Sequence, residues 1–240
     1  MTIIAFSDLD DTLFISGSRC EHLSGCKAAT VLPDGKVGAY STPQHQALIS
    51  LLHNACIIPV TGRRTDSLDR VLIDFESYKI ASHGAIILDA NNDLHPLWRM
   101  LLEAEASLWS RHMSRIKGEL EQHCDTHKLK LRIRIVSDKG FACYVCVKGE
   151  ISDLRQLQDR IDVLDTDGFV VHSNNRNLAL LPPFASKRRA VAFLKDILKS
   201  ESNKQLTFIG LGDSLSDSDF MSICDFQMTP SHSQISEVLN

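Results

Sequence analysis

The sequence predicts an α/β fold, in which a doubly wound, mainly parallel sheet forms the core and an α+β unit is inserted. Apolar runs at residues 3–6, 56–60 and 206–211 are one basis, because such runs indicate strands covered on both faces in a parallel sheet. A helical apolar period between the first two runs is the second, because parallel strands need crossover connections. The third is a change of pattern at about residue 96, where a long helical stripe begins.

The first apolar run ends at two carboxylates, Asp8 and Asp10, which are separated by a single residue. In open α/β sheets ligands bind beyond the carboxyl ends of the strands, so both carboxylates fall where such a fold places its chemistry. An acidic turn on the surface is the alternative for a pair of this kind. A calcium loop of the EF-hand type is excluded, because Leu13 and Arg19 stand where such a loop has glycine and glutamate.

Residues 14–42 form a segment that is longer than a strand-to-helix connection requires. The turn pair Asp34 and Gly35 lies between two short extended runs and predicts a hairpin. This hairpin either borders a pocket as a flap or lies on the surface without contacting a ligand. After it, Pro43 opens a predicted helix that leads into the strand at residues 56–60.

The pattern from there to residue 95 predicts one more helix and two short strands. The helix begins at about Thr65 and carries apolar residues on one face as far as Phe75. The strands, residues 79–82 and 85–88, follow with a glycine-containing turn between them.

The inserted unit, residues 96–177, is predicted to alternate helices with pairs of strands. A long apolar stripe from Trp98 to Leu120 predicts its first helix, and apolar positions from Ile151 to Ile161 predict its second. The predicted strands are residues 131–136, 141–147, 169–172 and 178–181. Polar residues near their ends are candidate contacts for a sugar, with simple solvent exposure as the alternative: Arg132, Arg134, His172, Asn174, Asn175 and Arg176.

The segment Asp8-Leu9-Asp10-Asp11-Thr12-Leu13, placed after an apolar strand, resembles the first motif of the haloacid dehalogenase superfamily, most of whose members are phosphatases. The three further motifs of that superfamily have counterparts here in the same order. They are Thr61 with Gly62 and Arg63 after the second apolar run, Lys187 at the start of a helix, and Asp213 with Asp217 after the third run. The chain is therefore similar to a haloacid dehalogenase phosphatase at both of its ends.

This resemblance implies a role for each motif. It implies that Asp8 attacks phosphorus and forms an aspartyl-phosphate, while Asp10 protonates the leaving oxygen, then deprotonates water, and offers its backbone carbonyl to a metal. The implied catalytic residues are Asp8, Asp10, Thr61 and Lys187, the phosphate-binding residues are Thr61, Gly62, Arg63 and Lys187, and the metal ligands are Asp8, Asp10, Asp213 and Asp217. Four carboxylates against one predicted cation need a metal, and oxygen ligands favour Mg²⁺.

The insertion lies between the second and third motifs, where one class of the superfamily carries a cap domain that covers the substrate. The resemblance therefore implies a discontinuous Rossmann-like core, residues 1–95 and 178–240, and a cap domain, residues 96–177. Residues 177–182 resemble the cap exit of the sucrose-phosphate phosphatase branch, one of the sugar-phosphate phosphatase branches. Arg188 and Ser216 depart from that branch, which usually has glycine and asparagine there.

We therefore expect a Mg²⁺-dependent phosphomonoester hydrolase that acts on a small phosphorylated metabolite, in particular a sugar phosphate. A phosphomutase of the phosphomannomutase type is one alternative, because it would use the same motifs. A non-catalytic phosphate-binding regulatory module is the other. The sequence identifies neither the metabolite nor the oligomeric state.

Charge and composition argue against other classes of function. The formal net charge of the 240 residues is −4, so no basic excess is present for binding nucleic acid. We expect no signal peptide and no membrane span, and hence a cytoplasmic protein, because no apolar stretch reaches the necessary length. The seven cysteines are expected to be reduced thiols. Cys143 and Cys146 face opposite sides of a predicted strand, which argues against a metal site there.

Overall fold

The computed structural model describes residues 2–20, 24–157, 168–174 and 177–239, and the chain divides into two compact units. The first unit comprises Met1–His95 and Lys187–Asn240, and the second comprises Pro96–Ser186. All four sequence motifs belong to the first unit. Among the described residues, the helices lack the combination of length and apolar character that crossing a membrane demands.

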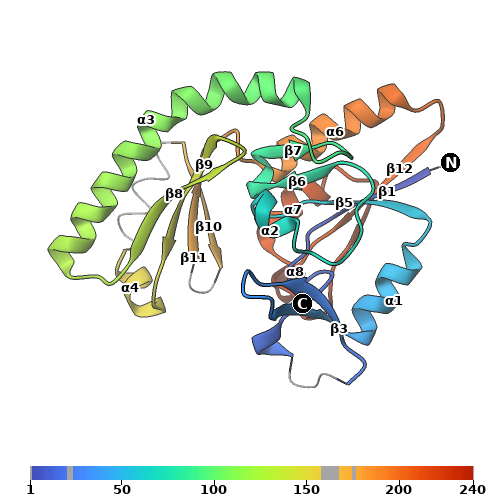
Figure 1. Cartoon of the computed structure of the whole chain (residues 1–240), viewed down its shortest axis with the longest axis horizontal. Helices are drawn as coiled ribbons and strands as arrows, with labels where there is room; N and C mark the ends of the chain where they lie inside the picture. Colours follow the sequence, from blue (N-terminus) through green and yellow to red (C-terminus); the bar gives the residue numbers. More distant parts are fainter. Residues whose placement is uncertain (1, 21–23, 158–167, 175–176, 240) are drawn as a thin grey trace. The chain divides into compact units, whose positions relative to one another are not determined.

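A four-stranded parallel sheet forms the centre of the first unit (Figure 1), with the strand order β13-β12-β1-β5. Its strands are β1 (Thr2–Ser7), β5 (Ala55–Pro59), β12 (Leu206–Leu211) and β13 (Phe226–Met228). The three predicted apolar runs are thus confirmed as neighbouring strands. Ser7 pairs with Pro59 on one side and with Leu211 on the other, so these strands end at the same level. The residues that follow them therefore meet at one edge of the sheet.

Helix α1 (Pro43–Leu51) covers one face of this sheet. It begins where predicted, because the Thr42 hydroxyl accepts a hydrogen bond from the His45 backbone N–H while the His45 ring accepts one from the Thr42 N–H. At the other end of the helix Leu52 is buried against Ala5 of β1. Burial of these apolar side chains fixes the crossover between β1 and β5.

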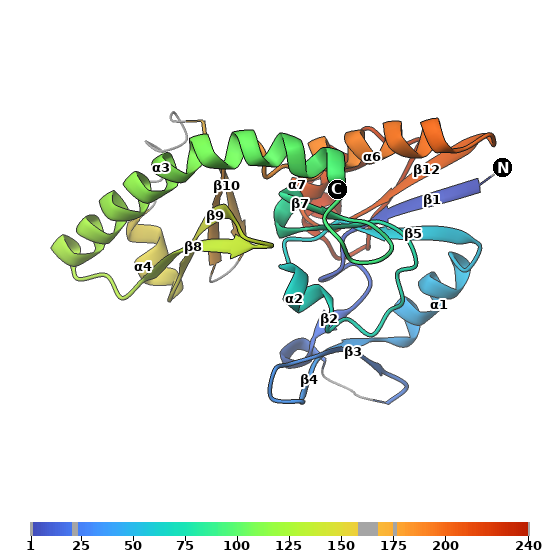
Figure 2. The same cartoon turned by 45° about the horizontal axis from the view of Figure 1, so that its top comes forward.

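Helix α6 (Lys187–Glu201) covers the opposite face, as Figure 2 shows. On this face the rings of Phe6 and Phe208 stack with their centroids 6.0 Å apart. The ammonium group of Lys195 in α6 lies 4.7 Å from the centroid of the Phe208 ring. Helices on both faces make the sheet doubly wound, as predicted. The helices α7 (Leu215–Met221) and α8 (Gln234–Leu239) follow β12 in the chain.

A short hairpin continues the structure beyond β5. Val60 forms a parallel bridge with Ile80 in strand β6 (Lys79–Ala81), which pairs with the antiparallel strand β7 (Ile86–Leu88). The 3₁₀ turn η2 (Ser82–Gly84) joins the two strands, which confirms the predicted turn.

The segment after β1 folds as a small sheet with the order β2-β4-β3, which confirms the predicted hairpin. Its elements are β2 (Ile15–Ser16), η1 (Gly17–Arg19), β3 (Lys27–Val31) and β4 (Val37–Ser41). The helix predicted from Thr65 is wrong in length, because α2 (Thr65–Leu68) is a single turn. The residues after it extend and pair with β3 instead, through a bridge between Thr30 and Val71.

The second unit is a four-stranded antiparallel sheet in the order β10-β11-β9-β8, accompanied by a long helix. Its elements are α3 (Pro96–His127), β8 (Arg132–Asp138), β9 (Phe141–Lys148), α4 (Ile151–Gln156), β10 (Val170–Asn174) and β11 (Asn177–Leu181). The predicted order of helix, two strands, helix and two strands is confirmed. Ile161, Asn175 and Arg176 lie outside the described residues.

The end of the second unit differs from the expected boundary at residue 177. Strand β11 pairs with both β9 and β10, so its hydrogen bonds belong to the sheet of the second unit. The division consequently falls after Ser186, at the start of α6. Residues 178–181 were predicted as the last strand of the inserted unit although the boundary was drawn at residue 177, and β11 shows that this strand does belong to the second unit.

Candidate functional site

The candidate site lies at the edge of the parallel sheet where β1, β5 and β12 end. Asp8 follows β1, and its backbone N–H donates to the Leu211 carbonyl at 2.8 Å, so the end of β1 is tied to the end of β12. Thr61 follows β5, and its backbone N–H donates to the Ile80 carbonyl at 3.0 Å. Ordinary ladder hydrogen bonds thus carry the two residues to the same edge from distant parts of the chain.

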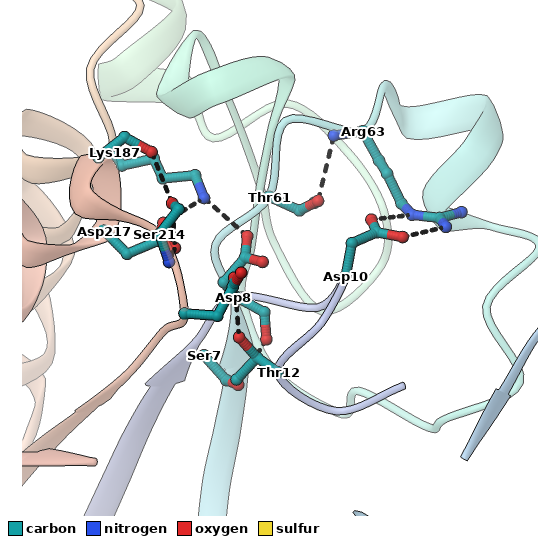
Figure 3. Close-up of polar contacts among 11 residues, drawn as sticks. Ser7, Asp8, Asp10, Thr12, Thr61, Arg63, Lys187, Ser214 and Asp217 are labelled. Atoms are coloured by element: carbon teal, nitrogen blue, oxygen red, sulfur yellow. Dashed lines mark hydrogen bonds and ion pairs between the residues drawn. The ribbon is translucent and has the colours of Figure 1, made fainter. Parts of the chain in front are cut away.

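Lys187, the first residue of α6, bridges two carboxylates at this edge (Figure 3). Its Nζ donates to Asp8 Oδ1 and to Asp217 Oδ1, in both cases at 2.6 Å. The side chains are nearly withdrawn from solvent, with exposed fractions of 12% for Lys187, 10% for Asp8 and 1% for Asp217. At these distances the hydrogen bonds are charge-assisted and stronger than neutral ones.

Asp217 owes its position to the start of α7. The Ser214 backbone N–H and hydroxyl donate to Asp217 Oδ2 at 3.1 and 2.6 Å, and the Asp217 backbone N–H donates to the Ser214 carbonyl at 2.9 Å. The helix also comes close to the end of β12, because a Cβ atom on Gly212 would lie 2.5 Å from the Asp217 Cβ. Glycine at this position therefore permits the approach that brings Asp217 to the site.

Asp213 completes a cluster of three carboxylates. One oxygen from each of Asp8, Asp213 and Asp217 lies within 4.8 Å of the others. The Thr12 hydroxyl donates to Asp213 Oδ1 at 3.4 Å, which links the turn after β1 to the end of β12. Among the described residues this is the group whose carboxylate oxygens converge closely enough to hold a metal ion.

Burial opposes the ionisation of these carboxylic acids. It raises the pKa of Asp8 well above its ordinary value, an effect that the Asp217 charge increases and the ion pair with Lys187 offsets in part. Burial and the Asp217 charge together raise the pKa of Asp213 to about 6. If all three carboxylates were ionised, they would carry more negative charge than one lysine balances, so a further cation would be needed to keep them ionised.

The surroundings of Asp217 and Lys187 favour the charged forms of these two side chains. Burial raises the pKa of Asp217, but the ion pair with Lys187 and the hydrogen bonds from Ser214 outweigh it and leave that pKa below its ordinary value. Burial likewise acts to lower the pKa of Lys187, whereas the carboxylates of Asp217 and Asp8 raise it well above the usual range. Lys187 is therefore a fixed positive charge at any physiological pH.

The chemistry of this cluster fits a magnesium ion. Its ligand atoms are carboxylate oxygens only, and such hard donors suit Mg²⁺ better than they suit softer metals. The raised pKa values of Asp8 and Asp213 describe carboxylates whose charge a divalent cation would stabilise. Asp8, Asp213 and Asp217 could therefore hold the ion together.

The carboxylate of Asp10 lies apart from this cluster. The chain turns after Asp8, because the Leu9 carbonyl accepts hydrogen bonds from the backbone N–H groups of Thr12, Leu13 and Phe14. Asp10 instead pairs with Arg63, whose Nε and Nη2 donate to Asp10 Oδ2 and Oδ1, each at 2.7 Å. The expectation that Asp10 shares one cluster with Asp8 is therefore not met by its side chain.

Thr61, Gly62 and Arg63 form a tight loop. The Thr61 hydroxyl accepts a hydrogen bond from the Arg63 backbone N–H at 3.1 Å, so its own hydrogen is free to point towards another acceptor. A Cβ atom on Gly62 would lie 2.5 Å from the His83 ring, so only glycine fits without displacing that ring. Sequence reasoning missed His83 and Ser214, because their contacts depend on loops that meet only in the folded chain.

Comparison with protein-family models gives a match over most of the chain. The family model described as sucrose-6F-phosphate phosphohydrolase matches residues 43–227, which is more than half of the chain. The matched region contains Thr61, Lys187, Asp213 and Asp217, while Asp8 and Asp10 precede it. Comparison with curated proteins gives no match.

Solved structures with the same fold include phosphatases. The sucrose-phosphatase from Synechocystis sp. PCC6803, solved in complex with sucrose and phosphate, is 17% identical and gives a TM-score of 0.56, with 100% of this chain and 87% of that chain covered. The C-terminal domain of C. albicans trehalose-6-phosphate phosphatase is 16% identical, with a TM-score of 0.57 and coverage of 92% and 73%. A haloacid dehalogenase-like hydrolase from Bacteroides thetaiotaomicron is 11% identical, with a TM-score of 0.53 and coverage of 99% and 98%. At these identities the likeness establishes the fold.

Proposed function

Because the chain belongs to the sucrose-6F-phosphate phosphohydrolase family, a family of phosphatases, we propose that it hydrolyses a small sugar phosphate through phosphoryl transfer to Asp8. One observation carries the proposal. Lys187 joins Asp8 to Asp217 at the edge of the sheet, with Asp213 beside them, so a carboxylate nucleophile stands next to a fixed cation and a metal-binding group.

Asp8 is the proposed nucleophile. An Asp8 carboxylate oxygen forms a bond to phosphorus while the bond from phosphorus to the sugar oxygen breaks, which leaves an aspartyl-phosphate and the free sugar. Water then attacks the same phosphorus, releases inorganic phosphate and restores the Asp8 carboxylate. The hydrogen bond from Lys187 holds Asp8 in place and disperses its charge until the ester arrives.

Thr61, Gly62 and Lys187 are proposed to bind the transferred phosphoryl group. The Thr61 hydroxyl, whose oxygen already accepts from the Arg63 N–H, donates to a phosphoryl oxygen, and the Gly62 N–H donates to another. Lys187 balances the charge on the phosphoryl oxygens during transfer. Asp8, Asp213 and Asp217 would hold Mg²⁺, together with the Asp10 backbone carbonyl that the family resemblance implies. When bound, the ion supplies Lewis-acid stabilisation of phosphoryl charge.

Asp10 is the proposed acid and base. As an acid it gives a proton to the sugar oxygen as the phosphorus–oxygen bond breaks, and as a base it takes a proton from the attacking water. Its carboxylate lies outside the buried cluster, and its side chain is 47% exposed, so it is accessible to a leaving group and to water. Asp8 and Asp10 would thus divide the chemistry between them.

The second unit, Pro96–Ser186, is proposed to select the sugar. All of the proposed reacting residues lie in the first unit, so the second is free to vary with the substrate. A small metabolite is favoured over a folded phosphoprotein, because the matching family model is described by the hydrolysis of a sugar phosphate.

A phosphate-release assay tests the proposal. Purified protein is incubated with Mg²⁺ and a panel of sugar phosphates that includes sucrose 6F-phosphate and trehalose 6-phosphate, and inorganic phosphate is measured against time. The proposal expects turnover with at least one sugar phosphate and none by Asp8→Asn. Interconversion of phosphate positions without release of phosphate would show a phosphomutase instead. Absence of both activities across the panel would overturn the proposal.

A further inference from the structure

The Asp10 carboxylate is held from one direction, by the guanidinium group of Arg63. Two parallel hydrogen bonds of 2.7 Å, from Nε and Nη2, engage both carboxylate oxygens, as Figure 3 shows. These are the hydrogen bonds that the Asp10 carboxylate accepts within the described part of the chain. A two-point contact fixes the plane of a carboxylate as well as its position, which a single hydrogen bond does not.

Arg63 is more firmly placed than its partner. Its side chain is 21% exposed, against 47% for Asp10. Its guanidinium carbon lies 5.2 Å from the centroid of the Phe14 ring, and its Nη1 donates to Ser67 Oγ at 3.3 Å. Its backbone is tied as well, since its N–H donates to the Thr61 hydroxyl and its carbonyl accepts from the Ser82 N–H at 2.7 Å.

We propose that Arg63 is a positioning residue, which fixes the direction of the Asp10 carboxylate relative to the phosphoryl-binding loop. The inference rests on the proposed function and gives Arg63 a different task from direct phosphate binding. The backbone of Arg63 meets the Thr61 hydroxyl, while its side chain holds Asp10. One residue thereby sets the distance between the group proposed to bind the phosphoryl oxygens and the group proposed to protonate the leaving oxygen.

Such a link has a chemical consequence. A proton donor works only when it is aimed at the leaving oxygen, and a misplacement of about 1 Å in an active site costs about 10²-fold in rate. The Asp10 side chain is half exposed, and Arg63 supplies the hydrogen bonds that orient its carboxylate. Lysine would not replace arginine here, because an ammonium group cannot donate two parallel hydrogen bonds to a carboxylate as the planar guanidinium group does.

Two aryl phosphates that differ in leaving group separate positioning from phosphate binding. 4-Nitrophenolate leaves readily without a proton, whereas phenolate is a stronger base and needs one. The kcat/KM for phenyl phosphate and for 4-nitrophenyl phosphate is measured with Mg²⁺ for wild type, Arg63→Met, Arg63→Lys, Asp10→Asn and the double variant Asp10→Asn/Arg63→Met. Inhibition by inorganic phosphate reports ground-state binding of the phosphoryl group. Arg64→Met is the matched control, because this neighbouring arginine pairs with Asp66 at 2.7 Å and not with Asp10.

The proposal expects a selective effect. Arg63→Met should lose about 10–100-fold in kcat/KM on phenyl phosphate and less than about threefold on 4-nitrophenyl phosphate, with phosphate inhibition unchanged. Arg63→Lys should show the same selectivity with a smaller loss. The double variant Asp10→Asn/Arg63→Met should be no less active than Asp10→Asn, since the two residues act as a unit. Arg64→Met should resemble wild type.

Other results would overturn the inference. Equal losses on both esters with weaker phosphate inhibition would make Arg63 a phosphate ligand, and full activity of Arg63→Lys would show that charge alone suffices. If Arg63→Met does not fold, as judged by its thermal unfolding, Arg63→Lys and Asp10→Asn carry the comparison. A wild-type protein that releases phosphate from neither ester and from no sugar phosphate of the panel would overturn the proposed function and this inference together, whereas wild-type turnover with equal losses would overturn only the inference.

Discussion

Asp8 and Asp10 stand two residues apart in the chain, and the folded protein surrounds them differently. The Asp8 side chain is 10% exposed and shares Lys187 with Asp217, so three charged groups meet in a nearly closed space. The Asp10 side chain is 47% exposed and forms an ion pair with Arg63. The first environment favours a nucleophile shielded from water, and the second favours a group that exchanges protons with a leaving group and with solvent.

The difference arises from where the strand ends. Had β1 continued, side chains two residues apart would have faced the same side of the sheet. The chain instead turns at Leu9, and Asp11 adopts a left-handed conformation with φ of 67°. One turn therefore gives different surroundings to two carboxylates that look equivalent in the sequence.

Replacing Asp8 should have the largest effect on activity. Asp8→Asn keeps the shape of the side chain but removes the carboxylate nucleophile, so phosphate release from any ester should fall below detection. The protein should remain folded, because the substitution removes a charge that burial opposes. Asp11→Asn is the matched control, since asparagine tolerates the left-handed backbone of this position and the residue lies outside the proposed chemistry. Phosphate release by Asp8→Asn at a rate close to that of Asp11→Asn would refute the role of Asp8.

Replacing Asp10 should have a large but uneven effect. Asp10→Asn removes the proposed acid, and a positioned acid contributes about 10²–10⁴-fold to rate. The loss in kcat/KM should therefore approach this range for a sugar phosphate and be much smaller for 4-nitrophenyl phosphate. Steady-state kinetics on both esters measures the difference. A uniform loss would mean that Asp10 and Asp8 do not differ in the way that their surroundings indicate.

Replacing Lys187 should weaken the fold as well as the chemistry. Lys187→Met leaves the buried carboxylates of Asp8 and Asp217 without their shared partner, and breaking such a pair costs about 3–5 kcal/mol of unfolding free energy. Urea unfolding in chelator measures this cost, and added Mg²⁺ should reduce it. Lys195→Met on the same helix, which loses a hydrogen bond to the Ile223 carbonyl, should cost only about 1 kcal/mol. Equal costs for both variants, unaffected by Mg²⁺, would contradict a charge-balanced cluster.

The pH dependence of the metal-free protein should show a smaller effect. Folding raises the pKa of Asp213 to about 6, so the folded state binds a proton more readily than the unfolded state, in which the pKa is about 4. The destabilising contribution of Asp213 should thus be full above pH 6 and should fade as the pH drops towards 4. Asp217 has a lowered pKa, so its stabilising contribution is lost only below about pH 4.

Comparison of wild type with Asp213→Asn isolates this effect. In chelator, the stability advantage of Asp213→Asn should be greatest at neutral pH and should shrink as the pH falls through 6. Mg²⁺ should bind wild type more weakly over the same interval, because protons compete for the same oxygens. Asp196→Asn, at an exposed position of α6, serves as the surface control. A difference between wild type and Asp213→Asn that does not change with pH would argue against a raised pKa.

Much of the fold follows from local sequence patterns. The apolar runs of β1, β5 and β12 predict a parallel sheet because burial on both faces leaves few polar positions. Given those strands, polar residues directly after them must meet at one edge. Asp213 follows the strand β12 in this way, whereas Lys187 and Asp217 were predicted from the family resemblance, and the structure brings the three residues together.

What the sequence does not reveal depends on contacts between distant segments. The pattern from Thr65 to Phe75 has helical spacing, but β3 offers backbone hydrogen bonds that draw residues 70–72 into an extended conformation. Arg63 was predicted to bind phosphate. The local sequence did not indicate that its guanidinium group pairs with Asp10, because the two residues lie 53 positions apart. Pairings of this kind depend on the turn after β1, which the sequence Asp8-Leu9-Asp10 does not specify.

The central claim, that Asp8 alone receives the phosphoryl group, can be tested by locating the group on the chain. Asp10→Asn, in which attack by water should be slowed, is mixed with 4-nitrophenyl phosphate and Mg²⁺, quenched in acid and treated with borohydride, which reduces an acyl phosphate to an alcohol. Peptide mass spectrometry then identifies which aspartate of the chain has been reduced, beginning with residues 2–20. The account predicts reduction of Asp8 that appears with the release of nitrophenol and is absent from Asp8→Asn. Reduction at Asp11 or Asp213, or turnover with no reduced aspartate at any time, would contradict it.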